Sequence, residues 1–186
     1  MLQNDKMKFT ENVGVSLIKK PLTESCIKLE GFFIVEHYDC KGNLKGIHKT
    51  KNVITNVGKN SILDVGLGGV AQIDPWYIGL VNNAGFTAFA VTDTMSSHAG
   101  WTEWQSYTEA NRVEWTSGAA TAQSITNATP ADFNQSASGT LKGIFITSNN
   151  TKGGTTGTLW SGASFATPIV VANTDLLKIT YTVSAG

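Results

Sequence analysis

Charged residues are scarce in this chain. Asp, Glu, Lys and Arg account for 15% of its 186 residues, well below the ~25% typical of soluble domains. Small hydroxyl and amide residues take their place, so the surface carries little charge to oppose self-association. The composition therefore favours a protein that docks to other copies of itself or to a larger assembly.

Cysteines and long apolar runs are also lacking. The two cysteines, Cys26 and Cys40, are too few for a disulfide scaffold, and their spacing matches no zinc-binding pattern. No segment approaches the ~18 apolar residues of a membrane span. The start, MLQNDKMKF, lacks the apolar core of a signal peptide. We expect reduced thiols, no membrane association and assembly in a cytoplasm.

Catalytic motifs are absent as well. The sequence contains no H-E-x-x-H, G-x-S-x-G, C-x-x-C or P-loop pattern. The best acid–base grouping, His98 with Asp93 and Glu103, is more simply explained by hydrogen bonding within a loop. Glu103, Glu109 and Glu114 offer the two carboxylates of a glycosidase, but the sequence does not place any two at the required separation of about 5 to 9 Å. We predict no catalytic residues, no cofactor and no metal site, and hence a protein that is not an enzyme.

The charges that are present are unevenly distributed. Residues 1–60 hold ten of the thirteen lysines against six acidic residues, a net charge of about +4, and the remainder carries about −4. Because these lysines are interleaved with acids and accompanied by no arginine, they lack the Arg-rich pattern of nucleic-acid readers. We expect a solvated or protein-docking surface and no direct contact with nucleic acid.

A β-hairpin is predicted over residues 31–54. Two runs rich in β-branched and aromatic residues flank Cys40-Lys41-Gly42-Asn43, a turn that contains the glycine needed for a positive φ. The lysines of the second strand form either a solvated edge, since lysines commonly protect sheet edges, or a contact for an acidic partner. These lysines are Lys45, Lys49 and Lys51.

The rest of the chain predicts short strands and one helix. Thr55-Asn56 offers an N-cap and the glycines that begin at Gly66 end the apolar pattern, so a helix is expected over 56–67. A strand follows over 76–81, and then a long irregular stretch from 82 to 107. Further strand signals cover 112–116, 122–127, 131–134, 141–147, 158–165, 169–172 and 176–183. Short strands at this spacing predict a mainly β fold, an antiparallel β-sandwich with a jelly-roll-like arrangement of about eight strands.

The first 27 residues differ from this pattern. They alternate polar and apolar residues without a sustained period. We therefore expect an extended N-terminal arm over 1–27, joined to a β-sandwich domain over 28–186. Ordering such an arm costs about 1 to 2 kcal/mol per residue, so we expect it to pack on another polypeptide, either a neighbouring copy or a different protein of the assembly.

Aromatic residues gather in the middle of the chain. Within forty residues lie Trp76, Tyr77, Trp101, Trp104, Tyr107 and Trp115. Such rings either fill a core or subunit interface, the simpler reading, or stack on sugars from loops. We expect that the long loop cannot bury all of its own aromatic side chains. Some of them should then face outward and form a dimer or trimer contact. The candidate assembly interface comprises Lys19, Lys20, Lys45, Lys49, Lys51, Phe86, Phe89, Trp101 and Trp104.

Four segments together resemble a widespread family of tailed-bacteriophage virion proteins. They are KNVITNVGKNSILDVGL, WYIGLVNNAGFTAFA, DTMSSHAGWTEW and SNNTKGGTTGTLWSGASF, and the resemblance spans about residues 28–185. It implies a head decoration or cement protein, clamped on the exterior of the capsid after assembly in the host bacterial cytoplasm. The implied partners are the major capsid protein and other copies of the chain, and no catalytic residue is carried over. A tail- or fibre-associated receptor- or glycan-binding module, with Trp101 and Trp104 in a sugar site, stays open as the alternative.

Overall fold

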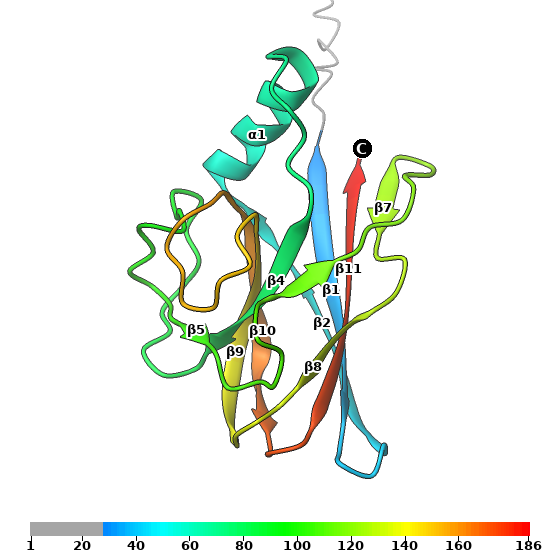
Figure 1. Ribbon diagram of the computed structural model, residues 1–186, viewed down its shortest axis with the longest axis vertical. Coiled ribbons are helices and arrows are strands. Elements are labelled where there is room, and N and C mark those ends of the chain that lie inside the picture. The colour runs from blue at the N-terminus through cyan, green and yellow to red at the C-terminus, as the bar shows by residue number, and fades with distance from the viewer. Residues whose placement is uncertain (1–27) are drawn as a thin grey trace, which may run out of the picture.

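The protein folds into two antiparallel β-sheets that pack face to face, with one helix at one end, in the part of the chain that the structure describes (Figure 1). The structure is a computed structural model and describes residues 28–186. The expected arm over 1–27, with Lys19 and Lys20, lies outside the described residues. The predicted mainly β sandwich is confirmed. Its elements are β1 (Leu29–Tyr38), β2 (Leu44–Lys51), β3 (Val53–Ile54), α1 (Asn56–Leu67), β4 (Trp76–Asn82), β5 (Glu103–Trp104), β6 (Val113–Trp115), β7 (Ser124–Thr126), β8 (Ala131–Asn134), β9 (Gly139–Thr147), β10 (Leu159–Val171) and β11 (Leu176–Ala185).

The first sheet has the order β2-β1-β11-β7, and β8 also pairs with β11. The predicted hairpin is present, because β1 and β2 pair from Phe32 opposite Lys51 to Tyr38 opposite Leu44. Gly42 in its turn has a φ of 80°, a conformation that glycine adopts without steric cost. Strand β1 also pairs with β11 along its whole length, so the first and last strands described lie side by side.

The second sheet has the order β3-β10-β9-β4-β5, and β6 also pairs with β4. Two strands that we expected over 158–165 and 169–172 are instead one strand, β10, with a register shift between Ser164 and Ile169. Pro168 lies in this interruption, where its missing N–H breaks no ladder. Within residues 28–186 the sheets contain eleven strands rather than about eight, several of them very short, and this strand order does not confirm the jelly-roll arrangement.

The main core lies between the two sheets. Side chains that alternate along the strands, such as Phe33 and Val35 of β1 and Ile144 and Ile146 of β9, are almost fully buried there. This alternation follows from the period of two of a β-strand. Each such side chain contributes about 1.5 to 3 kcal/mol on burial, so the facing sheets supply most of the stabilisation.

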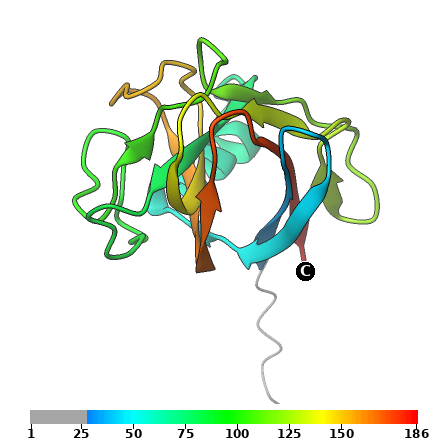
Figure 2. The same cartoon turned by 90° about the horizontal axis from the view of Figure 1, so that it is seen from below.

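A second, smaller core covers the outer face of the second sheet. The loop between β4 and β5 lies on that side, away from the first sheet (Figure 2). Its Trp101 and Met95 pack with Phe145 of β9 and with Val81 and Leu159. The sheet is therefore buried on both faces, and the long loop is part of the folded body.

Glycines of the second sheet make room for this loop. A Cβ on Gly162 would lie 2.2 Å from the Phe89 ring of the loop, whereas Gly79 makes room within the sheet for the ring of Phe145, its partner on β9. Real Cβ atoms do not approach that closely, so rings occupy the space that side chains would otherwise take. The apolar loop residues thus lie on a surface of glycines.

Helix α1 has the bounds that the sequence predicts. Its N-cap is Thr55, whose side-chain oxygen accepts a hydrogen bond from the backbone N–H of Gly58. The first turn packs on β10, where a Cβ on Gly58 would lie 2.4 Å from the Trp160 carbonyl oxygen. The rest of the helix projects from the end of the sandwich (Figure 1). Within residues 28–186, no helix has the length and apolar character that crossing a membrane requires.

Candidate functional site

An apolar pocket of about 340 Å³ opens beside α1, at the end of the sandwich where both sheets terminate. Both sheets, the helix and the segment after it contribute to its walls. The residues that line it are mostly apolar or small, and Asp74 is the one charged residue among them. They are Ser61, Ile62, Val65, Gly66, Gln72, Ile73, Asp74, Trp76, Trp115, Ser117, Ile125, Ile146, Trp160, Tyr181 and Val183.

The polar atoms of the aromatic walls are satisfied within the fold. Trp115 donates from Nε1 to Asn127 Oδ1 at 2.7 Å. Trp160 Nε1 and Asn52 Nδ2 each donate to the Tyr181 hydroxyl oxygen at 2.7 Å. Burial raises the pKa of Tyr181 to about 12, against the opposing effect of these hydrogen bonds. The phenol is therefore neutral at ordinary pH, and the rings present mainly apolar surface to a ligand.

Exposed apolar side chains also lie on α1 and the turn after it. Ile62 and Val65 line the pocket, whereas Leu63 and Leu67 lie on another face of the helix. Leu67 is 86% exposed and Leu63 57% exposed. Scattered exposed apolar residues are normal, but five on one short helix and the turn after it, next to an apolar pocket, favour an interaction surface. We call the pocket and these residues together the apolar end. The exposed members are Ile62, Leu63, Val65, Leu67 and Val70.

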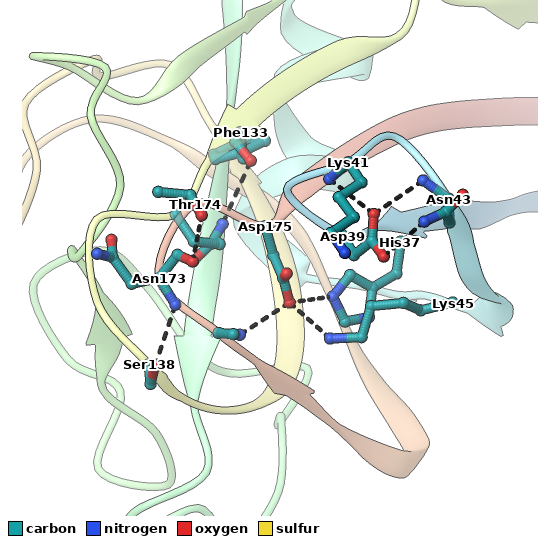
Figure 3. Close-up of polar contacts among 12 residues, drawn as sticks. His37, Asp39, Lys41, Asn43, Lys45, Phe133, Ser138, Asn173, Thr174 and Asp175 are labelled. Carbon is teal, nitrogen blue, oxygen red and sulfur yellow. Dashed lines mark hydrogen bonds and ion pairs between the residues drawn. The ribbon is translucent and has the colours of Figure 1, made fainter.

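A buried polar cluster lies at the other end of the first sheet and joins the β1–β2 hairpin to the turn between β10 and β11 (Figure 3). One oxygen of Asp175, Oδ2, accepts from His37 Nε2 and Lys45 Nζ at 2.7 Å and from the Ala172 backbone N–H at 2.8 Å. Burial acts to raise the pKa of Asp175, but these three donors together outweigh it and the pKa is lowered. The cluster fixes the hairpin to the body.

A second buried ion pair fixes the long loops. Arg112 donates from Nε and Nη2 to the two carboxylate oxygens of Glu103, both at 2.9 Å. The same guanidinium donates to the carbonyl oxygens of Asn149 and Gly154 at 2.9 Å, and Glu103 accepts from the Gly153 backbone N–H. A bidentate pair of this kind is among the stronger charge-assisted contacts, so the 149–157 loop is held against β5.

The acid–base grouping considered from the sequence is not assembled as a site. His98 Nδ1 lies 3.1 Å from the Trp101 carbonyl oxygen, and its ring stacks on the Trp101 ring. Asp93 accepts from Trp101 Nε1 at 3.0 Å, while Glu103 is bound to Arg112. Each of the three has a partner that holds a loop, in agreement with the structural interpretation.

The candidate aromatic residues of the long loop are more buried than we expected. Trp101 is only 2% exposed and lies in the second core, in agreement with the simpler of the two interpretations. It does not belong to the candidate assembly interface in which we placed it, and it presents no stacking face to a sugar. Phe86 and Phe89 are half-buried beside it. Trp104 is also half-buried and donates from Nε1 to Gln135 Oε1. The fit is possible because the sheet beneath is lined by glycines.

The candidate lysines of the hairpin have different environments. Lys45 is bound to Asp175 within the chain, which accounts for it without an acidic partner. Lys49 lies over the Phe32 ring, with Nζ 4.4 Å from its centroid. Lys51 is exposed on β2, the edge strand of the first sheet. Lys49, also exposed on this strand, and Lys51 both match the solvated edge that protects a sheet from pairing.

The pocket was not predicted from the sequence. Its aromatic walls come from β4, β6, β10 and β11, which are far apart in the chain. The helix sequence held one local signal of an exposed apolar surface. The apolar side chains of α1 do not share one face, since Ile62, Leu63 and Val65 point in different directions, so a single sheet cannot cover all of them.

No group of three or more His, Cys, Asp or Glu side chains within residues 28–186 is arranged to hold a metal ion. No protein-family model matches the chain, and no curated protein sequence is significantly similar to it.

Proposed function

We propose that this protein is a structural component of a tailed-bacteriophage virion, a capsid decoration protein that docks on the major capsid protein and on other copies of itself. The observation that carries the proposal is the apolar end, where an apolar pocket lies beside a helix that also exposes side chains such as Leu63 and Leu67. Such a surface suits burial against protein. The resemblance to phage virion proteins supplies the kind of assembly.

The remainder of the molecule suits a rigid clamp. Its long loops are held by the Arg112–Glu103 pair and by the second core, so docking does not have to order them. Many weak contacts repeated over a closed shell add up, because each tethered contact forms at high effective concentration. Exposed lysines such as Lys51 add about 0 to 1 kcal/mol per surface ion pair with an acidic shell, which gives orientation more than affinity.

The test compares phage particles that contain this protein with particles that lack it. Particles without the protein should assemble but release their DNA at a lower temperature, as measured with a DNA-binding dye during heating. Adding back the wild-type protein should restore the release temperature. Adding back Leu67→Asp should not, because a carboxylate would have to be buried in the docked surface.

Val170→Asp is the matched control. Val170 is 68% exposed and pairs with Thr140, far along β9 from the pocket residue Ile146. It should restore heat stability as well as the wild type does. Unchanged heat stability of particles that lack the protein, together with loss of host attachment, would overturn the proposal in favour of the receptor-binding module.

A further inference from the structure

We propose that the apolar pocket binds residues 13–18 of the N-terminal segment of a second copy, so that two copies exchange these segments through their apolar ends. This inference rests on the part of the proposed function that has copies of the chain contact one another. It assigns the contact to a named pocket and a named segment.

The pocket is poorly suited to water. At about 340 Å³ it has room for on the order of ten molecules, since each takes about 30 Å³ of liquid. A buried water needs two to four polar partners, whereas the N–H groups of Trp115 and Trp160 are directed to partners within the fold. An apolar occupant therefore gains from displacing poorly bound water.

The N-terminal segment contains a sequence of matching character. Val13-Gly14-Val15-Ser16-Leu17-Ile18 belongs to the longest uncharged run in residues 1–27. In an extended peptide, Val13, Val15 and Leu17 project to one side, and the small Gly14 and Ser16 to the other. Lys19 and Lys20 follow at once, so the end of the segment can reach the carboxylate of Asp74 at the pocket.

The segment joins the folded body beside the pocket. β1 begins at Leu29, opposite Ala185, and two residues further along Gly31 lies opposite the pocket residue Val183. The start of β1 and the C-terminus lie at the end where α1 projects (Figure 1). The ten residues between Ile18 and Leu29 span at most roughly 33 to 36 Å when extended. That length is enough to cross into a copy placed end to end.

A second copy fits this surface better than the chain's own segment does. β1 runs from its start into the body, so the preceding residues must reverse direction to enter their own pocket. A copy whose apolar end faces this one receives them directly. Leu63, Leu67 and Val70 do not line the pocket, so six residues bound in it leave them exposed, whereas a second copy docked end to end would also bury them. In a reciprocal exchange about a two-fold axis, each copy inserts its segment into the pocket of the other, so one type of contact fills both pockets.

The experiment is a cross-link that can form only between chains. In the full-length protein with Cys26→Ser and Cys40→Ser, one variant carries Ser16→Cys and the other carries Ser61→Cys at the pocket wall. One of the two bears a mass tag, and the mixture is treated with a short bismaleimide. The expected result is a mixed-mass dimer. A matched control with Ser96→Cys, exposed and outside the pocket lining, should give at least tenfold less.

Blocking the pocket supplies the second measurement. A Cβ on Gly66 would meet no atom within 4 Å, and leucine favours helix over glycine, so Gly66→Leu should fold while reducing the mixed dimer at least tenfold. No mixed dimer, or a link that forms only within a chain carrying both cysteines, would overturn the inference. If the cross-link fails while Leu67→Asp still abolishes particle stabilisation, the proposed function stands and the segment exchange is rejected. If the cross-link forms while particles without the protein are as heat-stable as complete ones, the exchange stands and the decoration function is rejected.

Discussion

Replacing Arg112 with methionine removes the cation that faces the buried Glu103 carboxylate. The side chains of Arg112 and Glu103 are 1% and 6% exposed. Methionine keeps much of the side-chain length but none of the donors, so Glu103 retains only the Gly153 backbone N–H among the contacts described above. Breaking a buried pair by removing one partner costs about 3 to 5 kcal/mol, and we expect a loss of that size in the free energy of unfolding.

Urea unfolding followed by tryptophan fluorescence measures this loss, with the slope against denaturant checked for constancy. Lys178→Met is the control, because the Lys178–Asp132 pair is 34% and 46% exposed and should contribute no more than about 1 kcal/mol. The double variant Arg112→Met with Glu103→Leu should recover part of the loss, since it leaves no buried charge unpaired. A loss below about 1 kcal/mol for Arg112→Met, or no recovery in the double variant, would refute the reasoning.

Two further predictions concern a core side chain and an acid-sensitive contact. Trp101→Ala should lower the free energy of unfolding by about 3 to 5 kcal/mol, while Trp101→Phe should lose less because a ring still fills the space; equal effects of the two in thermal melts would contradict the core assignment. Asp175 has a lowered pKa in the fold, so its contribution is present above its unfolded pKa of ~3.9 and is lost as the pH falls through the lower folded value. In melts from pH 6 to pH 3, Asp175→Asn should therefore be less stable than the wild type at the high end, with the difference shrinking below about pH 4; a difference that stays constant with pH would show that the charge of Asp175 does not matter.

Local signals explain what the sequence could predict. The hairpin and the helix were predicted correctly because a turn glycine at Gly42 and an N-cap at Thr55 act within a few residues. β10 was predicted as two strands because Pro168 interrupts the ladder, and only pairing with β9 shows that the strand resumes in the same sheet.

The candidate site depended on contacts that no local pattern reveals. The aromatic residues of the long loop were expected not to fit beneath it together, so that some would face a partner chain. They fit because Gly143 of β9 and Gly162 of β10, which are distant in the sequence, both leave space for Phe89 of the same loop. The pocket likewise exists only because Trp115 and Tyr181 meet at one end of the sandwich. Such juxtapositions are set by sheet order, which the sequence pattern left open.

The pairing of β1 with β11 determines how the domain responds to tension. Lys28 and Gly186 exchange backbone hydrogen bonds at 2.8 and 2.9 Å. A pull that separates these two residues peels the ladder one rung at a time from its open end. A pull that enters at Lys28 and leaves through the β10–β11 turn acts on β1 and β11 in opposite directions along their length, so the rungs from Leu29 opposite Ala185 to Tyr38 opposite Leu176 resist together in shear. The domain is therefore strong against a pull along β1 and β11 and weak against a pull that separates Lys28 from Gly186.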